Sequence, residues 1–339
     1  VGPQVSGEAV GSSIVGKIFK QNIIGATSSA PLLSNKDRYP YFSRVFPSDA
    51  YQGKILARIA HSLGIRKMFT IAISPNTYLD GIIMEFTSEC IRLGIHVLTI
   101  TVPPSFTSTE AHHAYTSIIN SNIRAGFIAD NSGLPDLLIT GKELGVFGAN
   151  WTWFGSESLF NVAATASFIE GFIGVLPGRD VPSDARKELF HCVDSHMNDE
   201  TGVFANLSIT DPRDFWNTFY YDGLQIMARA LHSIGGEWDK PDKLVESIRH
   251  TRYNGVTGPI EFDHETGDRL GVQYQIVNSV GGSMRTVGSV DSTTMRISFH
   301  GEPIMFPGGS STMALDFIMK CTLEEHYQLE IESCEPLRT

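Results

Sequence analysis

The chain has 339 residues, of which 42% are hydrophobic and 19% charged, a globular composition that excludes a disordered or fibrous protein. Its length exceeds what one hydrophobic core usually serves, so we expect two lobes. The net charge of −11, without a Lys/Arg-rich run, argues against nucleic-acid binding because an acidic chain repels phosphate. No apolar stretch is long enough to cross a bilayer, and no signal peptide precedes the strand-like start at Val1, which fits an excised region.

The four cysteines form no CxxC pair, so their spacing predicts no zinc site, and no cofactor or metal is expected. Cys90 and Cys192 are expected to be buried thiols, whereas Cys321 and Cys334 lie in a terminal tail, either free or paired with each other. Glycosylation sequons begin at Asn150 and at position 206, which favours secretion weakly.

Helices and strands alternate through the first half of the chain. Apolar residues at helical spacing, such as Ile55, Leu56 and Ile59, predict helices, and continuous apolar runs predict buried strands. The expected order is helix 51–63, strand 65–73, helix 80–93, strand 95–102, helix 109–120, strand 125–129 and helix 134–144. This alternation indicates parallel strands with helices on both faces.

The second half begins with two helices and then changes to strands. We expect helices at 215–234 and 241–250, strands at 255–262 and 271–278 around an Asp/Gly-rich turn, and short β runs over 283–299. A helical patch and an acidic tail should follow over 312–339. The predicted fold is therefore α/β, doubly wound, and such sheets bind ligands beyond the carboxyl ends of their strands.

Three segments carry a more specific signal in this order: 1–6 (VGPQVS) with 27–49, 254–268 (NGVTGPIEFDHETGD) with 274–278, and 306–309 (FPGG). Together they resemble the ligand-binding region of class C G-protein-coupled receptors of the metabotropic glutamate and GABA-B type. The resemblance implies a Venus-flytrap, periplasmic-binding-protein-like (type I) fold of two lobes, each with a doubly wound, mostly parallel sheet. Relatives normally carry a strand and helix before residues 1–6, so the first lobe is expected to be truncated.

The resemblance also implies where the chain crosses between lobes. Lobe one would contain residues 1–45 and 176–269, and lobe two residues 46–175 and 270–300, with 301–339 as a C-terminal tail or linker. A small, polar, amino-acid-like ligand would bind in the cleft, and closure of the lobes in a homo- or heterodimer would signal. The chain would lie on the extracellular side of the cell membrane, attached to it only through a segment outside this chain, with no nucleic-acid partner.

Small hydroxyl residues are the first candidates for the ligand site. Ser6 and the cluster Thr27, Ser28 and Ser29 follow predicted strands, where neighbouring backbone N–H groups can bind a carboxylate. Capping and turn formation are the alternative roles for these residues. The resemblance favours the ligand role for Ser6 and Ser29.

Two further candidates follow strands of lobe two. Tyr78 matches a family tyrosine whose ring covers the ligand and can hold an ammonium by cation–π attraction; its alternative role is packing at a helix start. Asn150 and Trp151 fall where relatives place polar or aromatic groups at the cleft. Glutamate-type receptors have an aspartate there, and the neutral Asn150 pairs less strongly with an ammonium, which weakens the case for glutamate.

Two aspartates and a tryptophan complete the comparison. Asp49 matches a family aspartate near the first hinge crossing, and as an alternative it caps the helix that starts at Tyr51. Asp222 is expected to order a helix start. Trp216 stands where GABA-type members have an acidic residue, so neither known ligand chemistry is reproduced in full.

No nucleophile-elbow, phosphate-loop or zinc-protease motif occurs, so an enzyme is not expected. The adjacent His112 and His113 have no metal-ligand partners at suitable spacing and are expected on a solvated helix face. A soluble substrate-binding protein of a transporter and a receptor subunit that has lost its ligand remain as alternatives.

Overall fold

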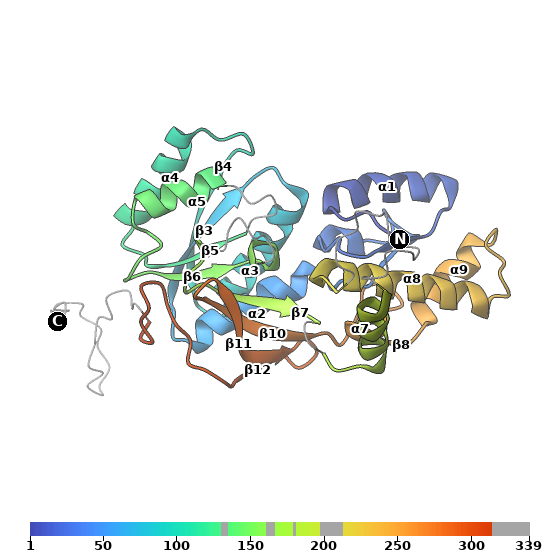
Figure 1. The fold of residues 1–339 in the computed structure, drawn as a ribbon. Helices are drawn as coiled ribbons and strands as arrows, with labels where there is room; N and C mark the ends of the chain where they lie inside the picture. Colours follow the sequence, from blue (N-terminus) through green and yellow to red (C-terminus); the bar gives the residue numbers. More distant parts are fainter. Residues whose placement is uncertain (130–134, 161–166, 179–180, 197–212, 314–339) are drawn as a thin grey trace, which may run out of the picture.

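The computed structural model describes residues 1–129, 135–160, 167–178, 181–196 and 213–313. Its largest feature is an eight-stranded sheet of order β12-β11-β10-β7-β6-β5-β3-β4 (Figure 1). The strands β3 to β7 run parallel, and β10 to β12 are added antiparallel at one edge. Their bounds are β3 Lys67–Ile73, β4 His96–Val102, β5 Ala125–Ile128, β6 Thr152–Gly155, β7 Ile173–Pro177, β10 Gln273–Val280, β11 Ser283–Asp291 and β12 Arg296–Phe299.

Helices from the first half of the chain pack beside this sheet. They are α2 Asp49–Ser62, α3 Thr77–Arg92, α4 Ser108–Asn120, α5 Pro135–Glu143 and α6 Glu157–Phe160. Helix α2 packs against α3, and α4 packs against α5. The core between these layers includes Phe69, Phe127 and Trp153, all fully buried. We call this part of the molecule the large lobe.

A second group of elements lies beside the large lobe in Figure 1 and forms the small lobe. It contains α1 Ser6–Phe19, β1 Ile23–Gly25, η1 Pro31–Ser34, β2 Phe42–Arg44, α7 Asp184–His196, α8 Phe215–Ser233, α9 Pro241–His250, β8 Tyr253–Gly255 and β9 Gly258–Ile260. Strands β1 and β2 are parallel, and the Gly2 amide donates to the Ile24 carbonyl on the other side of β1. One buried cluster, which includes Ile24, Phe219 and Ile226, forms its core, and a second cluster includes Leu33 and Phe42.

The mixed α/β fold predicted from periodicity is confirmed, and the long elements begin and end within three residues of the predicted bounds. Three details differ. Residues 255–262 form most of a hairpin, β8–β9, in which residues 256–257 make the turn and Gly258, with φ of +94°, begins the return strand. Within the described residues, the small lobe has a two-stranded parallel sheet rather than a doubly wound one. The Cys192 thiol on α7 is exposed, whereas Cys90 is buried as expected.

The FPGG segment belongs to the large lobe. Phe306 is buried in its core, and the Asn278 side chain donates to the Met305 carbonyl. Gly308 has φ of +85° and lies so close to Ala149 that a Cβ would come within 2.8 Å of it. Residues 305–308 therefore pack on the large lobe, although residues 301–339 were expected to form a tail or linker. The predicted helical patch and acidic tail beyond residue 313 lie outside the described residues, and so do Cys321, Cys334 and the sequon at position 206.

None of the helices that the structure describes combines the length and the apolar character that crossing a bilayer requires.

Candidate ligand-binding site

Two loops of the large lobe leave neighbouring parts of the sheet at the same edge. The chain passes from the carboxyl end of β3 through residues 74–76 into α3, which places Tyr78 at the start of that helix. It likewise passes from β6 into α6, which places Glu157 and Ser158 there. Because β3, β5 and β6 are parallel neighbours, these side chains meet at the carboxyl edge of the sheet, where open α/β sheets bind ligands.

The small lobe contributes two loops of its own. The turn after β1 carries Thr27 and Ser29, and the residues before α1 lie beside it. The Thr27 hydroxyl donates to the Gln4 carbonyl at 3.0 Å, and the Ser28 hydroxyl donates to the Pro3 carbonyl at 2.6 Å. These bonds fix the turn against the start of α1.

The loops of the two lobes enclose a pocket of about 190 Å³, which we call the interlobe pocket. Its lining combines hydroxyl groups, one carboxylate and two apolar side chains. The lining residues are Gln4, Val5, Ser6, Thr27, Ser29, Tyr78, Glu157, Ser158 and Trp216. Of the predicted site residues, the structure brings Ser6, Thr27, Ser29 and Tyr78 together here.

The start of α1 gives one end of the pocket a positive character. Its N-cap residue, Val5, provides no side-chain cap, so the first N–H groups of this 14-residue helix are not bonded by a capping side chain. The Ser6 hydroxyl accepts a hydrogen bond from the Ala30 amide at 3.2 Å. A helix N-terminus beside serine and threonine hydroxyls is suited to a carboxylate.

The opposite wall of the pocket is acidic. Glu157 is 1% exposed, and the Tyr78 hydroxyl lies 3.0 Å from each of its carboxylate oxygens. Ser158 donates to the Tyr78 hydroxyl at 3.0 Å. Burial raises the pKa of Glu157 above its usual value, while hydrogen bonds from Tyr78 and Ser158 oppose this shift. A ligand ammonium placed here would stabilise the carboxylate form.

Asp49 lies beneath the pocket rather than in its lining. It is the first residue of α2, and Ser48 caps that helix by accepting from the Ala50 amide, so the predicted capping role of Asp49 belongs to Ser48. The Asp49 amide donates to the Ser29 carbonyl at 2.9 Å, and the Ser29 hydroxyl bonds its carboxylate. Burial, followed by the nearby Glu157 carboxylate, raises the pKa of Asp49 well above its usual value.

Three more of the predicted site residues lie outside the lining of the interlobe pocket. Ser28 is buried against Pro3 and does not line the pocket. Asn150 is exposed, and Trp151 packs against Phe69 before β6 begins, at the end of the strand opposite the interlobe pocket. A buried acidic residue instead follows β6, at Glu157.

Asp222 lies inside α8 rather than at its start. Its carboxylate accepts from the Val256 and Thr257 amides, at 2.8 and 2.9 Å, and from the Thr257 hydroxyl at 2.6 Å. It therefore ties α8 to the β8–β9 hairpin and does not line the interlobe pocket.

Sequence reasoning missed Gln4, Val5, Glu157 and Ser158, and it noted Trp216 only as a departure from relatives. Glu157 could have been found, because Gly155 ends a buried apolar run and the residues after such a strand face the ligand edge. Trp216 is brought to the pocket by the packing of α8, with its ring 5.7 Å from that of Phe46, which no local pattern reveals.

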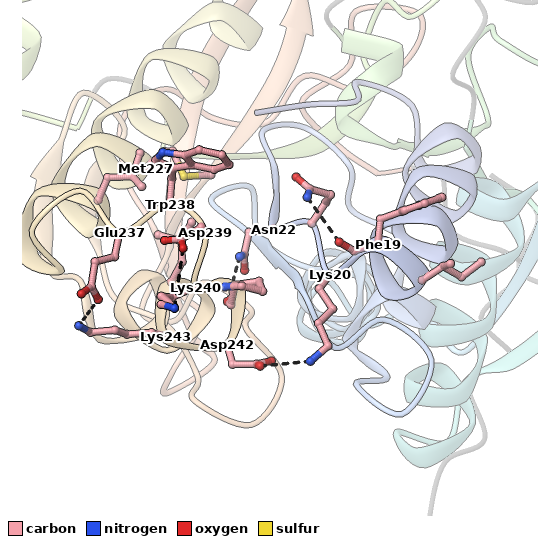
Figure 2. Close-up of a pocket in the computed structure, with 15 residues that line it drawn as sticks. Phe19, Lys20, Asn22, Met227, Glu237, Trp238, Asp239, Lys240, Asp242 and Lys243 are labelled. Atoms are coloured by element: carbon pink, nitrogen blue, oxygen red, sulfur yellow. Dashed lines mark hydrogen bonds and ion pairs between the residues drawn. The ribbon is translucent and has the colours of Figure 1, made fainter.

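A larger groove of about 1160 Å³ lies elsewhere on the small lobe, between the end of α1 and the start of α9 (Figure 2). Residues 18–22, 227, 231 and 237–244 line it, and we call it the α1–α9 groove. Its charged side chains bond one another, as Figure 2 shows for Lys20 with Asp242 and Lys243 with Glu237. Its charged groups are exposed and mutually compensated, so the interlobe pocket is the better candidate for a specific polar ligand.

A two-lobed α/β arrangement with a large, mostly parallel sheet and a polar pocket between the lobes is the periplasmic-binding-protein-like (type I) fold. The model of the Receptor family ligand binding region matches residues 1–282, so the chain belongs to that family.

Receptors of several organisms are similar to the chain. Metabotropic glutamate receptor-like protein E of Dictyostelium discoideum is 24% identical over 333 residues, covering 94% of this chain and 40% of that protein. Metabotropic glutamate receptor 8 of Homo sapiens is 27% identical over 334 residues, covering 82% and 36%. Glutamate receptor 3.4 of Arabidopsis thaliana is 22% identical over 337 residues, covering 85% and 32%. These matches confirm the resemblance to class C receptors, and the chain spans less than half the length of these relatives.

Proposed function

We propose that the chain is the extracellular ligand-binding region of a cell-surface receptor and that it binds a small amino-acid-like ligand in the interlobe pocket. One observation carries this proposal: the uncapped start of α1 faces a buried carboxylate across a pocket of about 190 Å³. A zwitterion needs these two ends, one for its carboxylate and one for its ammonium. No catalytic role is proposed.

The residues divide between the two ends of the ligand. Ser6 and Ser29, with the N–H groups of α1, hold the ligand carboxylate through charge-assisted hydrogen bonds. Glu157 accepts the ligand ammonium, and the Tyr78 ring lies beside it with its hydroxyl already directed at Glu157. Asp49 supports Ser29 from below.

Closure of the lobes is the proposed signal. Residues 1–45 and 176–269 would form lobe one, and 46–175 and 270–300 lobe two. The Phe46 ring, at the first crossing, packs in the small-lobe core. A ligand that contacts both lobes favours the closed state by its greater affinity for that state. The hinge then converts binding into a change of shape.

A homo- or heterodimer is part of the proposal. Helix α1 exposes four large apolar side chains, and contiguous apolar surface of this kind marks interaction sites. These residues are Ile14, Val15, Ile18 and Phe19. Attachment to the membrane would come through a segment outside this chain.

A thermal-shift screen against amino acids, GABA-like amines and small organic acids tests the proposal. A ligand at about one hundred times its dissociation constant should add about 2.7 kcal/mol to the free energy of unfolding, which raises Tm visibly. The rise should disappear in Ser29→Ala and Tyr78→Ala and persist in Asp242→Asn, a control in the α1–α9 groove. A cooperative melt that no compound shifts would contradict the proposal and favour a subunit without ligand.

A further inference from the structure

The interlobe pocket has an unequal balance of charge. Glu157 is its one charged lining residue among those that the structure describes, and none of the described lining residues is Lys or Arg. The ammonium of a bound amino acid can pair with Glu157, and its carboxylate can lie at the start of α1. No described side chain of the lining is then left to neutralise a second carboxylate.

The buried guanidinium groups near the crossings between the lobes are used elsewhere. Arg44 donates to Asp268 at 2.8 Å, to the Ala30 carbonyl at 2.9 Å and to Ser34 at 2.7 Å. Arg269 donates to the Val45 carbonyl, at 3.0 Å, and to Thr257, at 2.7 Å to its hydroxyl. Neither arginine lines the pocket, so releasing one for a ligand would break several buried hydrogen bonds.

The remaining lining is uncharged. Trp216 lies in the first turn of α8, and its ring is held by Phe46 at 5.7 Å and by Phe215 at 4.9 Å between centroids. Val5 and the amide of Gln4 complete this part of the lining. The Trp216 ring and Val5 gain free energy when they bury an aliphatic side chain, and this part of the lining offers a carboxylate no cation.

The size of the pocket limits the ligand further. Its volume of about 190 Å³ is below the range of roughly 300–1,000 Å³ that is usual for drug-sized ligands. A single small amino acid is the scale of molecule that it can enclose.

We infer that the ligand is a free amino acid with an uncharged side chain, which packs against Trp216, and that the pocket discriminates against acidic amino acids such as glutamate. This inference rests on the proposed function, since it takes the interlobe pocket as the site. Trp216 is then the specificity-determining residue, because it occupies the wall where a distal carboxylate would need a cation. The like charge of Glu157 adds to the discrimination.

Isothermal titration calorimetry with alanine, leucine, glutamate and lysine tests the inference. The wild-type protein should bind alanine or leucine at least about tenfold more tightly than glutamate, because an unpaired buried carboxylate is costly. Trp216→Lys should reverse this preference by supplying a cation, and Trp216→Phe should retain it. The same substitution at the exposed Trp238, Trp238→Lys, is the matched control and should leave the preference unchanged.

Each outcome separates the two proposals. Glutamate or lysine binding as tightly as alanine and leucine, or a Trp216→Lys variant that melts normally but keeps the wild-type preference, would overturn the inference and leave the interlobe site standing. If none of the four amino acids binds a protein that melts cooperatively, the proposed function itself fails.

Discussion

Glu157 lines the interlobe pocket, and its carboxylate is buried and bonded to the Tyr78 hydroxyl. Burial raises its pKa above the usual 4.5, so the empty pocket keeps a proton on this group to higher pH than an exposed glutamate would. A ligand ammonium favours the ionised form, and binding should therefore release a proton.

The affinity for a neutral amino acid should consequently rise as the pH increases from 4.5 through the raised pKa of Glu157. Titration calorimetry in buffers of different ionisation enthalpy would measure both the affinity and the proton release. Glu157→Gln removes the titrating group, so that variant should bind weakly and lose this pH dependence. An affinity in the wild-type protein that does not change with pH would contradict the assignment of Glu157 as the ammonium partner.

Asp49 provides a separate prediction about stability. Its folded-state pKa is raised well above 3.8, so the folded protein retains a proton that the unfolded chain releases. The stability that this proton provides is complete below pH 3.8 and is lost as the pH rises through the folded-state pKa. Asp49→Asn should abolish that loss.

Urea unfolding from pH 3.5 to about 8 measures the effect. The variant and wild-type protein should have similar stability at the acidic end, and the variant should become relatively more stable as the pH rises. A constant difference across the whole range would show that Asp49 does not carry a raised pKa. Asparagine has an NH₂ group that can donate to the Ser29 hydroxyl as the protonated carboxyl does, which limits the direct effect on the loop.

At the scale of elements, Asp222 connects two pieces of chain that are distant in sequence. Three donors from Val256 and Thr257 converge on its carboxylate inside the small lobe. Asp222→Asn replaces one acceptor oxygen by an NH₂ donor facing those donors, and it should lower the free energy of unfolding by about 2–4 kcal/mol. Asp239→Asn, at an exposed ion pair with Lys240, should change it by less than about 0.5 kcal/mol. Equal effects of the two substitutions in urea unfolding would refute this structural role.

The elements that sequence reasoning predicted well are those whose burial produces a long periodic pattern. Helices α2 to α4 each bury an apolar face and strand β3 buries an apolar run, and these patterns are local. Strands β1, β2, β8 and β9 have three residues each and are held by neighbours far along the chain, so no local period marks them. The turn in the β8–β9 hairpin, at residues 256–257 before Gly258, was concealed by the apparently continuous β run.

The same contrast applies to the candidate site. Ser6, Ser29 and Tyr78 were predicted from strand ends and from the family resemblance, and the structure brings them into one pocket. Trp151 was taken from the family resemblance, and it lies before β6, whereas Glu157, which lines the pocket, follows β6. Trp216 lines the pocket because α8 packs against the first crossing between the lobes, and this packing is a property of the tertiary structure.

At the scale of the whole molecule, we propose that both lobes contact one ligand in the interlobe pocket. Titration calorimetry with alanine and leucine tests this directly. The proteins to compare are the wild type, Ser29→Ala from one lobe, Glu157→Gln from the other lobe, and the groove control Asp242→Asn. Each pocket variant should weaken binding by about 10- to 100-fold, since each loses a hydrogen bond to a charged group of the ligand, and the control should match wild type. Weakened binding in Asp242→Asn alone, with both pocket variants unchanged, would place the ligand in the α1–α9 groove and contradict the account.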